Sequence, residues 1–173
     1  MIRTAGTGDA ATLATLAAAT FPLACPPDAK PEAVADFIAR HLTESNFDAY
    51  LADPARQVLI AERDGVPSGY TMLVHGEPTD TDVIAAISVR PTAELSKCYL
   101  LQDTHGSGLA GELMTATVDA ARTRGAAALW LGVNNQNAKA NRFYEKHGFT
   151  IVGTKKFLVG KRWEDDFVRE RVL

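Results

Sequence analysis

The chain has 173 residues, of which 46% are hydrophobic and 23% charged, so it can bury the core of one domain. It carries 18 basic and 21 acidic residues, and this net charge of −3 disfavours nucleic-acid binding, which needs a basic face. Two cysteines, Cys25 and Cys98, are too few for a disulfide-rich secreted scaffold, and we expect both to be reduced thiols. The four histidines are scattered without metal-ligand spacing, so we expect no metal site.

A lipoprotein-like leader is weakly suggested by the alanine-rich run at residues 10–19 and by Leu23-Ala24-Cys25. Gly8-Asp9 and several threonines interrupt this segment, and Pro22 stands where a small apolar residue is wanted, so a continuous apolar region is missing. No run approaches the roughly 20 apolar residues of a membrane span. We therefore expect a cytoplasmic protein without membrane contact, forming a single domain over residues 1–173, with a homodimer left open.

The first half of the chain combines helical patterns with one hairpin. Thr7-Gly8-Asp9 offers side chains that can cap the alanine-rich helix, and Phe21-Pro22 is expected to end it. Apolar residues at helical spacing follow Pro31, and Asp64-Gly65 separates two apolar runs as a hairpin turn does. We expect strands at residues 2–5, 58–62 and 68–74, helices at 10–21, 31–42 and 43–51, and a polar loop at 75–82.

The second half alternates strands and helices. An amphipathic helix from Gly106 to Arg124 ends at Gly125, and a second helix ends at Gly148. Because hairpins occur beside this alternation, the pattern predicts a mixed α/β (α+β) fold with an early antiparallel and a later parallel part, and with helices on both faces. The remaining elements are expected at 94–101, 127–133, 149–157 and 167–172 (strands) and at 137–147 (helix).

A glycine-containing turn, His105-Gly106-Ser107-Gly108-Leu109-Ala110, joins a strand to the Gly106–Arg124 helix. Glycines let the backbone approach a ligand, and the free N–H groups of a first helical turn bind anions such as a pyrophosphate. The turn lacks the Gly-Lys-Ser/Thr of a P-loop and the third glycine of a dinucleotide fingerprint. Taken alone, it is equally compatible with a tight strand-to-helix turn.

A second cluster runs from Asn137 to Phe149 after the next strand. Asn137 can cap the helix, and Tyr144 lies two helical turns further along the same face. The Asn137 amide and the Tyr144 hydroxyl can therefore address one elongated ligand.

Together these stretches resemble the GCN5-related N-acetyltransferase (GNAT) family. The cofactor motif of that family, Gln/Arg-x-x-Gly-x-Gly/Ala, matches residues 105–110, with His105 where Gln or Arg is usual. Its next motif, Asn-x-x-Ala-x-x-(apolar)-Tyr-Glu-Lys-x-Gly-Phe, matches residues 137–149 essentially without gaps. The resemblance covers nearly the whole chain, from Ile2-Arg3 to the 165–170 strand. The Glu-Leu-x-x-x-Tyr pattern at 94–99 is similar to that of bacterial polyamine-type acetyltransferases.

The resemblance implies a GNAT-like mixed sheet of about seven strands, splayed between strands 4 and 5, with acetyl-CoA as cosubstrate between strands 94–101 and 127–133. It assigns the pantetheine arm to the backbone of Leu100 and Leu101, and proton donation to the leaving thiolate to Tyr144. His105 in the usual Gln/Arg position is expected to weaken the cofactor contacts modestly. The cofactor-binding residues implied are Leu100, Leu101, His105, Gly106, Ser107, Gly108, Leu109, Ala110, Asn137 and Tyr144.

The acceptor amine must lose a proton before it attacks. Glu94 is the candidate base, because it is the first residue of the strand expected to hold the cofactor. A solvated strand-end glutamate remains an open alternative. We expect Cys98 to pack in the core, since no His or Asp partner for a nucleophile is evident. An acidic cluster, Glu77, Asp80 and Asp82, would favour a cationic substrate if it borders the acceptor entrance.

The sequence therefore predicts an acetyl-CoA-dependent N-acetyltransferase. It is expected to transfer the acetyl group directly, in a ternary complex, to a primary amine of a small cationic or polyamine-like molecule. Two alternatives stay open: a protein N-terminal or lysine acetyltransferase, and a non-catalytic CoA-binding regulatory module.

Overall fold

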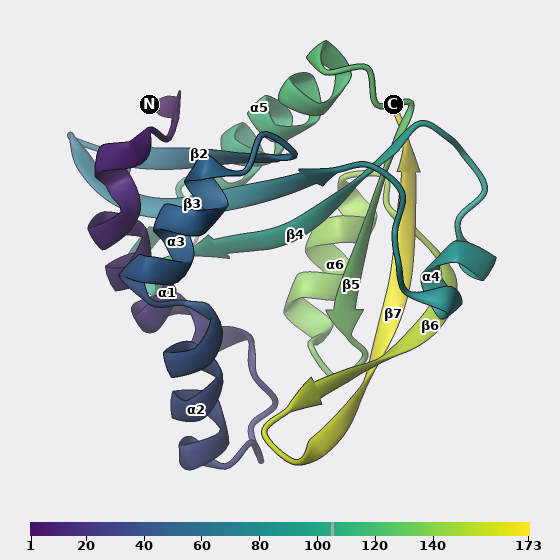
Figure 1. The fold of residues 1–173 in the computed structure, drawn as a ribbon, viewed down its shortest axis with the longest axis horizontal. Coiled ribbons are helices and arrows are strands. Elements are labelled where there is room, and N and C mark those ends of the chain that lie inside the picture. The colour runs from purple at the N-terminus through teal and green to yellow at the C-terminus, as the bar shows by residue number, and fades with distance from the viewer. Residues whose placement is uncertain (105) are drawn as a thin grey trace.

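A seven-stranded mixed sheet organises the protein, and the computed structural model describes residues 1–104 and 106–173, with the backbone alone at Asp103 (Figure 1). The strand order is β1-β2-β3-β4-β5-β7-β6, in agreement with the expected mixed α/β class and strand number. The strands are β1 (Ile2–Thr4), β2 (Arg56–Arg63), β3 (Val66–His75), β4 (Thr92–Leu100), β5 (Ala128–Asn134), β6 (Thr150–Val159) and β7 (Arg162–Val172). The helices are α1 (Ala10–Ala24), α2 (Pro31–His41), α3 (Glu44–Ala52), α4 (Thr81–Ala86), α5 (Leu109–Thr123) and α6 (Ala138–Lys146).

The parallel pair β4–β5 is paired over a short length. Thr92, Ala93 and Glu94 pair with residues 128–130 of β5, and no pairing follows toward the C-terminal ends of the two strands. All other neighbouring strands are antiparallel. Beyond Glu94 the strands diverge, and each leaves backbone groups unpaired with the other. The splay expected between strands 4 and 5 is thus present.

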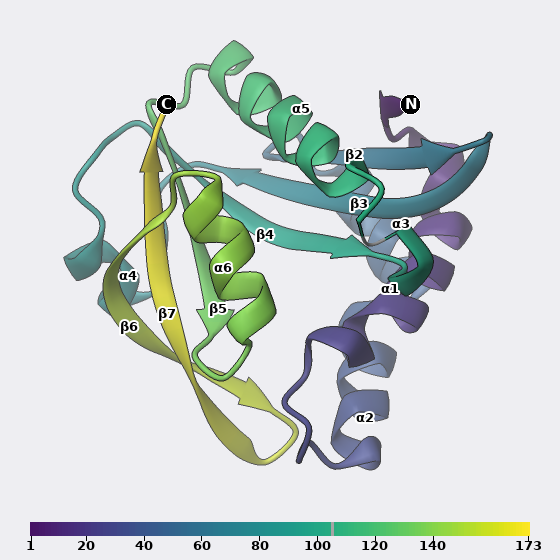
Figure 2. The same ribbon diagram turned by 180° about the vertical axis from the view of Figure 1, so that it is seen from behind.

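The helices lie on both sides of the sheet, as expected (Figures 1 and 2). We call the side that carries α1, α2 and α3 the front face, and the side that carries α5 and α6 the rear face. On the front face the fully buried Phe47 and Tyr70 belong to one apolar cluster with residues of α1. On the rear face Met114 of α5 and Phe149 join a cluster with Leu129 and Leu131 of β5.

A β-bulge at Ser96 sets which β4 side chains reach each face. Met72 pairs with Lys97 and Leu73 with Leu95, so Ser96 is an extra residue on β4. Leu95 packs into the rear cluster, whereas Tyr99 packs against the front one. The bulge therefore gives Glu94 and Lys97, three residues apart, the same orientation, and it turns Cys98 to the rear.

Several element boundaries differ from those expected. Helix α1 continues past Pro22 to Ala24, because a proline in the last turn removes one helical hydrogen bond without ending the helix. The expected loop at 75–82 instead ends in α4, whose first N–H groups, from Asp82 and Val83, are capped by the side chain of Asp80. Strand β7 begins at Arg162 rather than Phe167, and its added residues are mostly charged.

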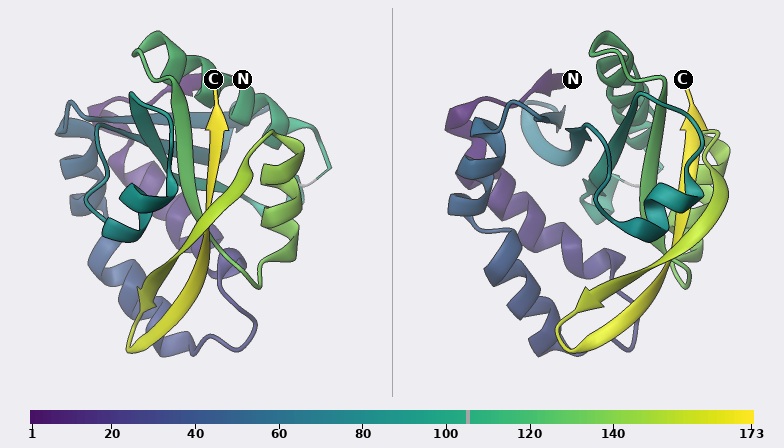
Figure 3. Two further views of the ribbon diagram at one scale, coloured as in Figure 1. Left: turned by 90° about the vertical axis from the view of Figure 1, so that its right-hand side faces the viewer. Right: turned by 45° about the vertical axis from the view of Figure 1, so that its right-hand side comes forward.

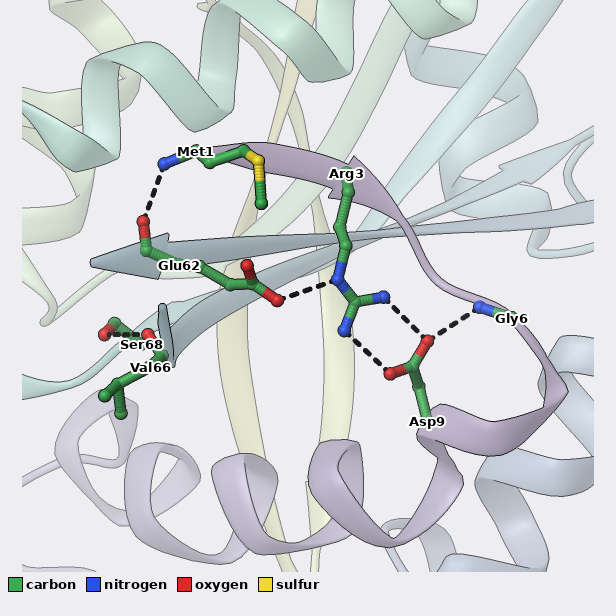
Figure 4. A network of polar contacts seen from close by, with 7 residues as sticks. All are labelled: Met1, Arg3, Gly6, Asp9, Glu62, Val66 and Ser68. Carbon is green, nitrogen blue, oxygen red and sulfur yellow. Dashed lines mark hydrogen bonds and ion pairs between the residues drawn. The ribbon is translucent and has the colours of Figure 1, made fainter. Parts of the chain in front are cut away.

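The N-terminal strand is fastened by a network centred on Arg3 (Figure 4). The guanidinium donates two hydrogen bonds of 2.8 Å to the carboxylate of Asp9 and one of 2.7 Å to Glu62. The Asp9 carboxylate also accepts the Gly6 N–H. The side chain that stabilises the start of the first helical segment is therefore the carboxylate of Asp9 and not the hydroxyl of a threonine. This network joins β1, β2 and the start of α1.

No helix in the described ranges is both long and apolar enough to cross a membrane.

Candidate active site

Two cavities meet where β4 and β5 diverge. The front cavity, of about 230 Å³, is lined by residues of α1 and α2, of the open part of β4 and β5, and of the β6–β7 hairpin. Figure 3 shows how these elements are arranged. The rear cavity, of about 280 Å³, lies between β4, the start of α5, α6 and the end of α1. The two share one wall, formed by Ala24, Cys98, Tyr99, Asn137, Ala140 and Tyr144. Two different molecules can therefore be held with their ends in contact.

The start of α5 borders the rear cavity and is shaped to receive an anion. Gly106 and Gly108 have φ angles of 86° and 87°, which side-chain-bearing residues rarely adopt. The first helical hydrogen bonds run from the N–H groups of Gly111 and Glu112 to the Gly108 carbonyl. The Leu109 N–H donates to the Ser107 hydroxyl at 3.4 Å, and Ala110 directs its N–H outward from the positive end of the helix dipole. Gly106 and Ala110 line the rear cavity, and His105 lies outside the described residues.

Leu100 and Leu101 differ in what their backbone offers to a ligand. The Leu101 N–H donates to the Ser68 carbonyl at 2.9 Å, and its own carbonyl accepts the hydroxyl of Thr104 at 2.6 Å. Both groups are thus engaged inside the protein, which corrects the expectation that Leu101 pairs with the pantetheine arm. Since backbone groups alternate in direction along a strand, Leu100 directs its N–H and carbonyl toward the open edge. Leu100 also lines the rear cavity.

Asn137 and Tyr144 stand on the wall between the cavities. The Asn137 side chain caps α6 as expected, accepting the N–H of Ala140 at 3.0 Å. The Tyr144 ring packs edge-on against Phe149, and its hydroxyl lies close enough to the Cys98 thiol for the two to influence each other's pKa. Burial raises the pKa of Tyr144 well above its ordinary value, so the phenol stays protonated at neutral pH and can donate a proton.

The Cys98 side chain packs against the rear apolar cluster, as expected, and it also lines both cavities. Burial raises its pKa to about 12, and the Tyr144 hydroxyl only partly offsets that effect. Because the thiolate is the nucleophilic form, this thiol is unreactive near neutral pH. Cys25, in the front cavity, has its pKa raised by burial to about 11, and both cysteines are free.

Glu94 lines the front cavity from the floor of the splay. Burial raises the pKa of its carboxyl, and the charges of Lys97, Lys155 and Arg56 partly counter that rise. Burial also lowers the pKa of Lys97 to about 8, against the opposing effect of Glu94. The pattern is that of a carboxylate with raised proton affinity in a partly dry site, which is what proton acceptance from an amine requires.

The front cavity contains two further carboxylates, Glu164 and Asp166 of β7, that sequence analysis missed. They are 5% and 6% exposed. Burial raises the pKa of Asp166 to about 6, and the charge of Lys155 opposes the rise. Glu164, Asp166 and Val168 are alternate residues of β7, so their side chains lie on the same, front face of the sheet. This alternation is the sequence signal from which the two carboxylates could have been found. It was overlooked because the strand was expected to begin only at Phe167.

Of the predicted acidic cluster, Asp80 is the member that approaches the site. Its carboxylate lies 3.9 Å from the Lys155 ammonium, and Lys155 lines the front cavity. Glu77 instead pairs with Arg90 at 2.9 Å, away from the cavity lining. The cluster thus contributes one charge to the edge of the site, through Lys155.

Comparison with known proteins agrees with this geometry. The sequence profile described as Acetyltransferase (GNAT) family matches residues 19–149. The chain belongs to the GNAT acetyltransferase family. A GNAT member with this fold is an acyltransferase that uses acetyl-CoA as cosubstrate. An "Uncharacterized N-acetyltransferase" of Mycobacterium tuberculosis is 46% identical over 165 residues, which cover 95% of this chain and 98% of the relative.

Solved GNAT structures share the fold at low sequence identity. The PaiA N-acetyltransferase of Thermoplasma acidophilum, solved with coenzyme A, superposes with a TM-score of 0.78 at 18% identity, over 100% of this chain and 98% of that one. A ribosomal-protein-alanine N-acetyltransferase of Brucella melitensis gives 0.70 at 24% identity, over 100% and 99%. The second of these is named for a protein acceptor, and a shared fold does not by itself define the acceptor of this GNAT chain.

Proposed function

We propose that this GNAT protein transfers the acetyl group of acetyl-CoA to a primary amine of a small cationic molecule, by direct attack while both are bound. The observation that carries the proposal is the shared wall between the two cavities, with Tyr144 in it. The rear cavity has the features of a cofactor site: the α5 N-terminus and the unpaired edge of β4. The front cavity has a carboxylate suited to deprotonating an amine.

In this proposal the rear cavity binds the cofactor through its backbone. N–H groups of the 106–110 turn hold the pyrophosphate, with Gly106, Gly108 and Ala110 as the donors. The N–H groups of Ser107 and Leu109 donate to the Thr104 carbonyl and the Ser107 hydroxyl, at 3.2 and 3.4 Å, and shape the turn. Leu100 pairs with the pantetheine arm along the open edge of β4. Asn137 keeps α6, and hence Tyr144, in place through its cap.

The reaction divides the proton transfers between two residues. Glu94 accepts the proton of the acceptor ammonium, whose ordinary pKa near 10 leaves little free amine at neutral pH. The amine lone pair then forms the C–N bond at the thioester carbonyl as the C–S bond breaks. Tyr144 donates its proton to the departing sulfur, giving the free thiol of coenzyme A, and the second proton, which the nitrogen loses as the amide forms, restores the Tyr144 hydroxyl. No covalent enzyme intermediate is invoked, in keeping with the high pKa of Cys98.

An acceptor of small size fits the front cavity better than a folded protein does. The cavity extends inward to Glu94 on the floor of the splay, and aromatic rings of Phe21, Phe37 and Phe157 form its walls. Acetylation of a protein N-terminus or lysine would favour a flat, open groove. A role as a non-catalytic CoA-binding module is disfavoured by the presence of both Glu94 and Tyr144. The polyamine-type acceptor stays a prediction within the class of small cationic amines.

The test is release of coenzyme A thiol from acetyl-CoA in the presence of a panel of amines. The panel contains n-alkylamines, diamines, amino acids and a peptide with a free N-terminus. We expect turnover with small cationic amines and little with the peptide. If only the peptide is turned over, protein acetylation replaces the proposal. If acetyl-CoA binds but no amine of the panel causes thiol release, the non-catalytic CoA-binding module is favoured.

A further inference from the structure

We propose that Asp166, supported by Glu164, forms an ammonium-binding subsite in the front cavity that selects acceptors carrying a second positive charge, such as α,ω-diamines. This inference rests on the proposed function and specifies the acceptor. The amine that reacts lies at Glu94, and the second ammonium lies at β7.

The first observation is an unsatisfied buried oxygen. Asp166 is 6% exposed, lines the front cavity, and its Oδ1 has no hydrogen-bond partner among the described residues. A buried carboxylate oxygen without a partner is costly, typically by about 1–3 kcal/mol or more. A ligand that donates a charged hydrogen bond to it recovers that cost, and an ammonium is such a donor.

The second observation is the balance of charge around the cavity. Glu94, Glu164 and Asp166 line it, against the ammonium groups of Lys97 and Lys155. Lys155 is shared, since its charge acts on both Glu94 and Asp166, and its Nζ lies 3.9 Å from Asp80. When Glu94 has taken the proton of the reacting amine, Glu164 and Asp166, together with Asp80 beside Lys155, still exceed Lys97 and Lys155 by one negative charge, which favours one further ammonium.

Glu164 is held in place from the outside of the cavity. Arg162 donates to its carboxylate at 3.0 Å and is at the same time paired with Asp28 at 2.8 Å. The Asn134 amide also reaches Glu164, at 3.4 Å. Because Glu164 is already partnered, it adds negative potential to the subsite, and Asp166 is the residue that supplies the open acceptor.

The third observation is space at Gly132. A Cβ built there would lie 2.7 Å from the Lys155 side chain and 3.2 Å from Asp166 Oδ2. Glycine at this position lets both side chains lie over β5. In register, Glu94 is opposite Trp130 and Asp166 is opposite Asn134, four residues apart along β5. At about 3.3 Å per residue the offset along the strand direction is about 13 Å.

The experiment measures binding by calorimetric titration with coenzyme A present. The ligands are α,ω-diamines of three to eight methylenes and n-alkylamines of matching length. Asp166→Asn is compared with Asp165→Asn, which removes the same charge from the neighbouring residue, exposed on the opposite side of β7 and paired with Lys156. We expect Asp166→Asn to weaken diamine binding about 10- to 100-fold and alkylamine binding less than about threefold. Asp165→Asn should match the wild type.

A second pair of variants guards against a folding defect. Lys155→Met removes the internal ammonium that competes for Asp166, so diamine binding should become tighter, whereas Lys156→Met should leave it unchanged. A gain in affinity cannot arise from misfolding. Four outcomes would each overturn the subsite. The affinity for diamines could fall equally in Asp165→Asn and Asp166→Asn, or fall in neither. It could fail to rise in Lys155→Met, or the wild type could bind diamines no better than alkylamines.

Thiol release with the same amines reports on the proposed function separately. If Asp166→Asn weakens diamine binding but the wild type releases no thiol, the subsite stands and acetyl transfer to amines fails. If thiol is released and the variant binds diamines normally, transfer stands and the subsite fails.

Discussion

Glu94 and Lys97 face the same cavity, although they are three residues apart on one strand, because the bulge at Ser96 interrupts the alternation between them. Their charges oppose one another: Lys97 lowers the pKa of Glu94, while Glu94 limits the fall in the pKa of Lys97. An undistorted strand would direct the two side chains to opposite faces. The proton affinity of the proposed base therefore depends on a backbone irregularity.

Replacing Lys97 with methionine should raise the pKa of Glu94, because a neighbouring positive charge is removed while the length of the side chain is kept. Glu94 accepts a proton only when ionised, so the acid limb of kcat/KM should move to higher pH. The measurement is the pH profile with the best amine of the panel. Lys156→Met, at an exposed site outside the cavity lining, serves as control. An unmoved acid limb would separate Lys97 from the proton transfer.

Glu94→Gln should depress kcat/KM and remove the acid limb that Glu94 produces. Glutamine keeps the shape and hydrogen bonding of glutamate but cannot accept the proton. Burial raises the pKa of Glu94, so in the wild type this limb should lie above the ordinary range for glutamate. Profiles that superimpose for wild type and variant would show that another group takes the proton.

Tyr144→Phe should lower kcat by about 10²–10⁴-fold with a much smaller change in the KM for acetyl-CoA, because it deletes a proton donor and keeps the ring. The control is Tyr70→Phe, which removes a buried hydroxyl without a hydrogen-bond partner, on β3 and outside both cavities. Steady-state kinetics on both variants decide the assignment. If the two behave alike, the Tyr144 hydroxyl has no part in the reaction.

Gly108→Ala should weaken coenzyme A binding more than Gly125→Ala does. These glycines flank the two ends of α5 with nearly equal φ angles of 87° and 86°, and no atom of the residues that the structure describes lies within 4 Å of a Cβ added at either. The backbone strain is therefore matched, at about 1–2 kcal/mol each. Only Gly108 is at the end proposed to hold the pyrophosphate. Calorimetric titration with coenzyme A measures the difference, and equal affinities would contradict this placement.

Asp9→Asn should destabilise the protein by about 1 kcal/mol at neutral pH, because the carboxylate is partly buried and paired with Arg3. The pKa of Asp9 is lowered from 3.8 to about 2, so its contribution is complete above pH 4 and is lost as the pH falls through 2. Denaturant unfolding of both proteins at pH 7 and pH 2 tests this. The difference in unfolding free energy should shrink at the lower pH.

Much of the fold follows from the sequence because the long amphipathic segments carry clear periodicity. The Gly106–Arg124 stretch and the 137–147 stretch become α5 and α6, with Asn137 as the cap. The prediction that α1 ends at Pro22 was wrong, because a proline is tolerated in the last turn of a helix. Helix α4 has six residues, too few for a period to be visible, and it depends on the cap by Asp80.

The site was harder to predict because it depends on three-dimensional relationships. The bulge at Ser96 has no local sequence signal, and it decides where Lys97 and Cys98 point. The bonds that engage Leu101 come from Ser68 and Thr104, which only the folded chain brings near. Asp166 lies in a charged stretch with low strand propensity, and pairing with β5 and β6 overrides that propensity.

The short pairing of β4 with β5 also bears on how the two halves of the sheet move. Within the sheet, strands β1–β4 are joined to strands β5–β7 by three residue pairs at one end. We therefore expect the two sub-sheets of the free protein to pivot about this short pairing. A molecule that binds along the open edge of β4, between the two sub-sheets, would restrict this motion. Hydrogen exchange at the backbone amides of Cys98 and Leu100 would then slow when coenzyme A binds.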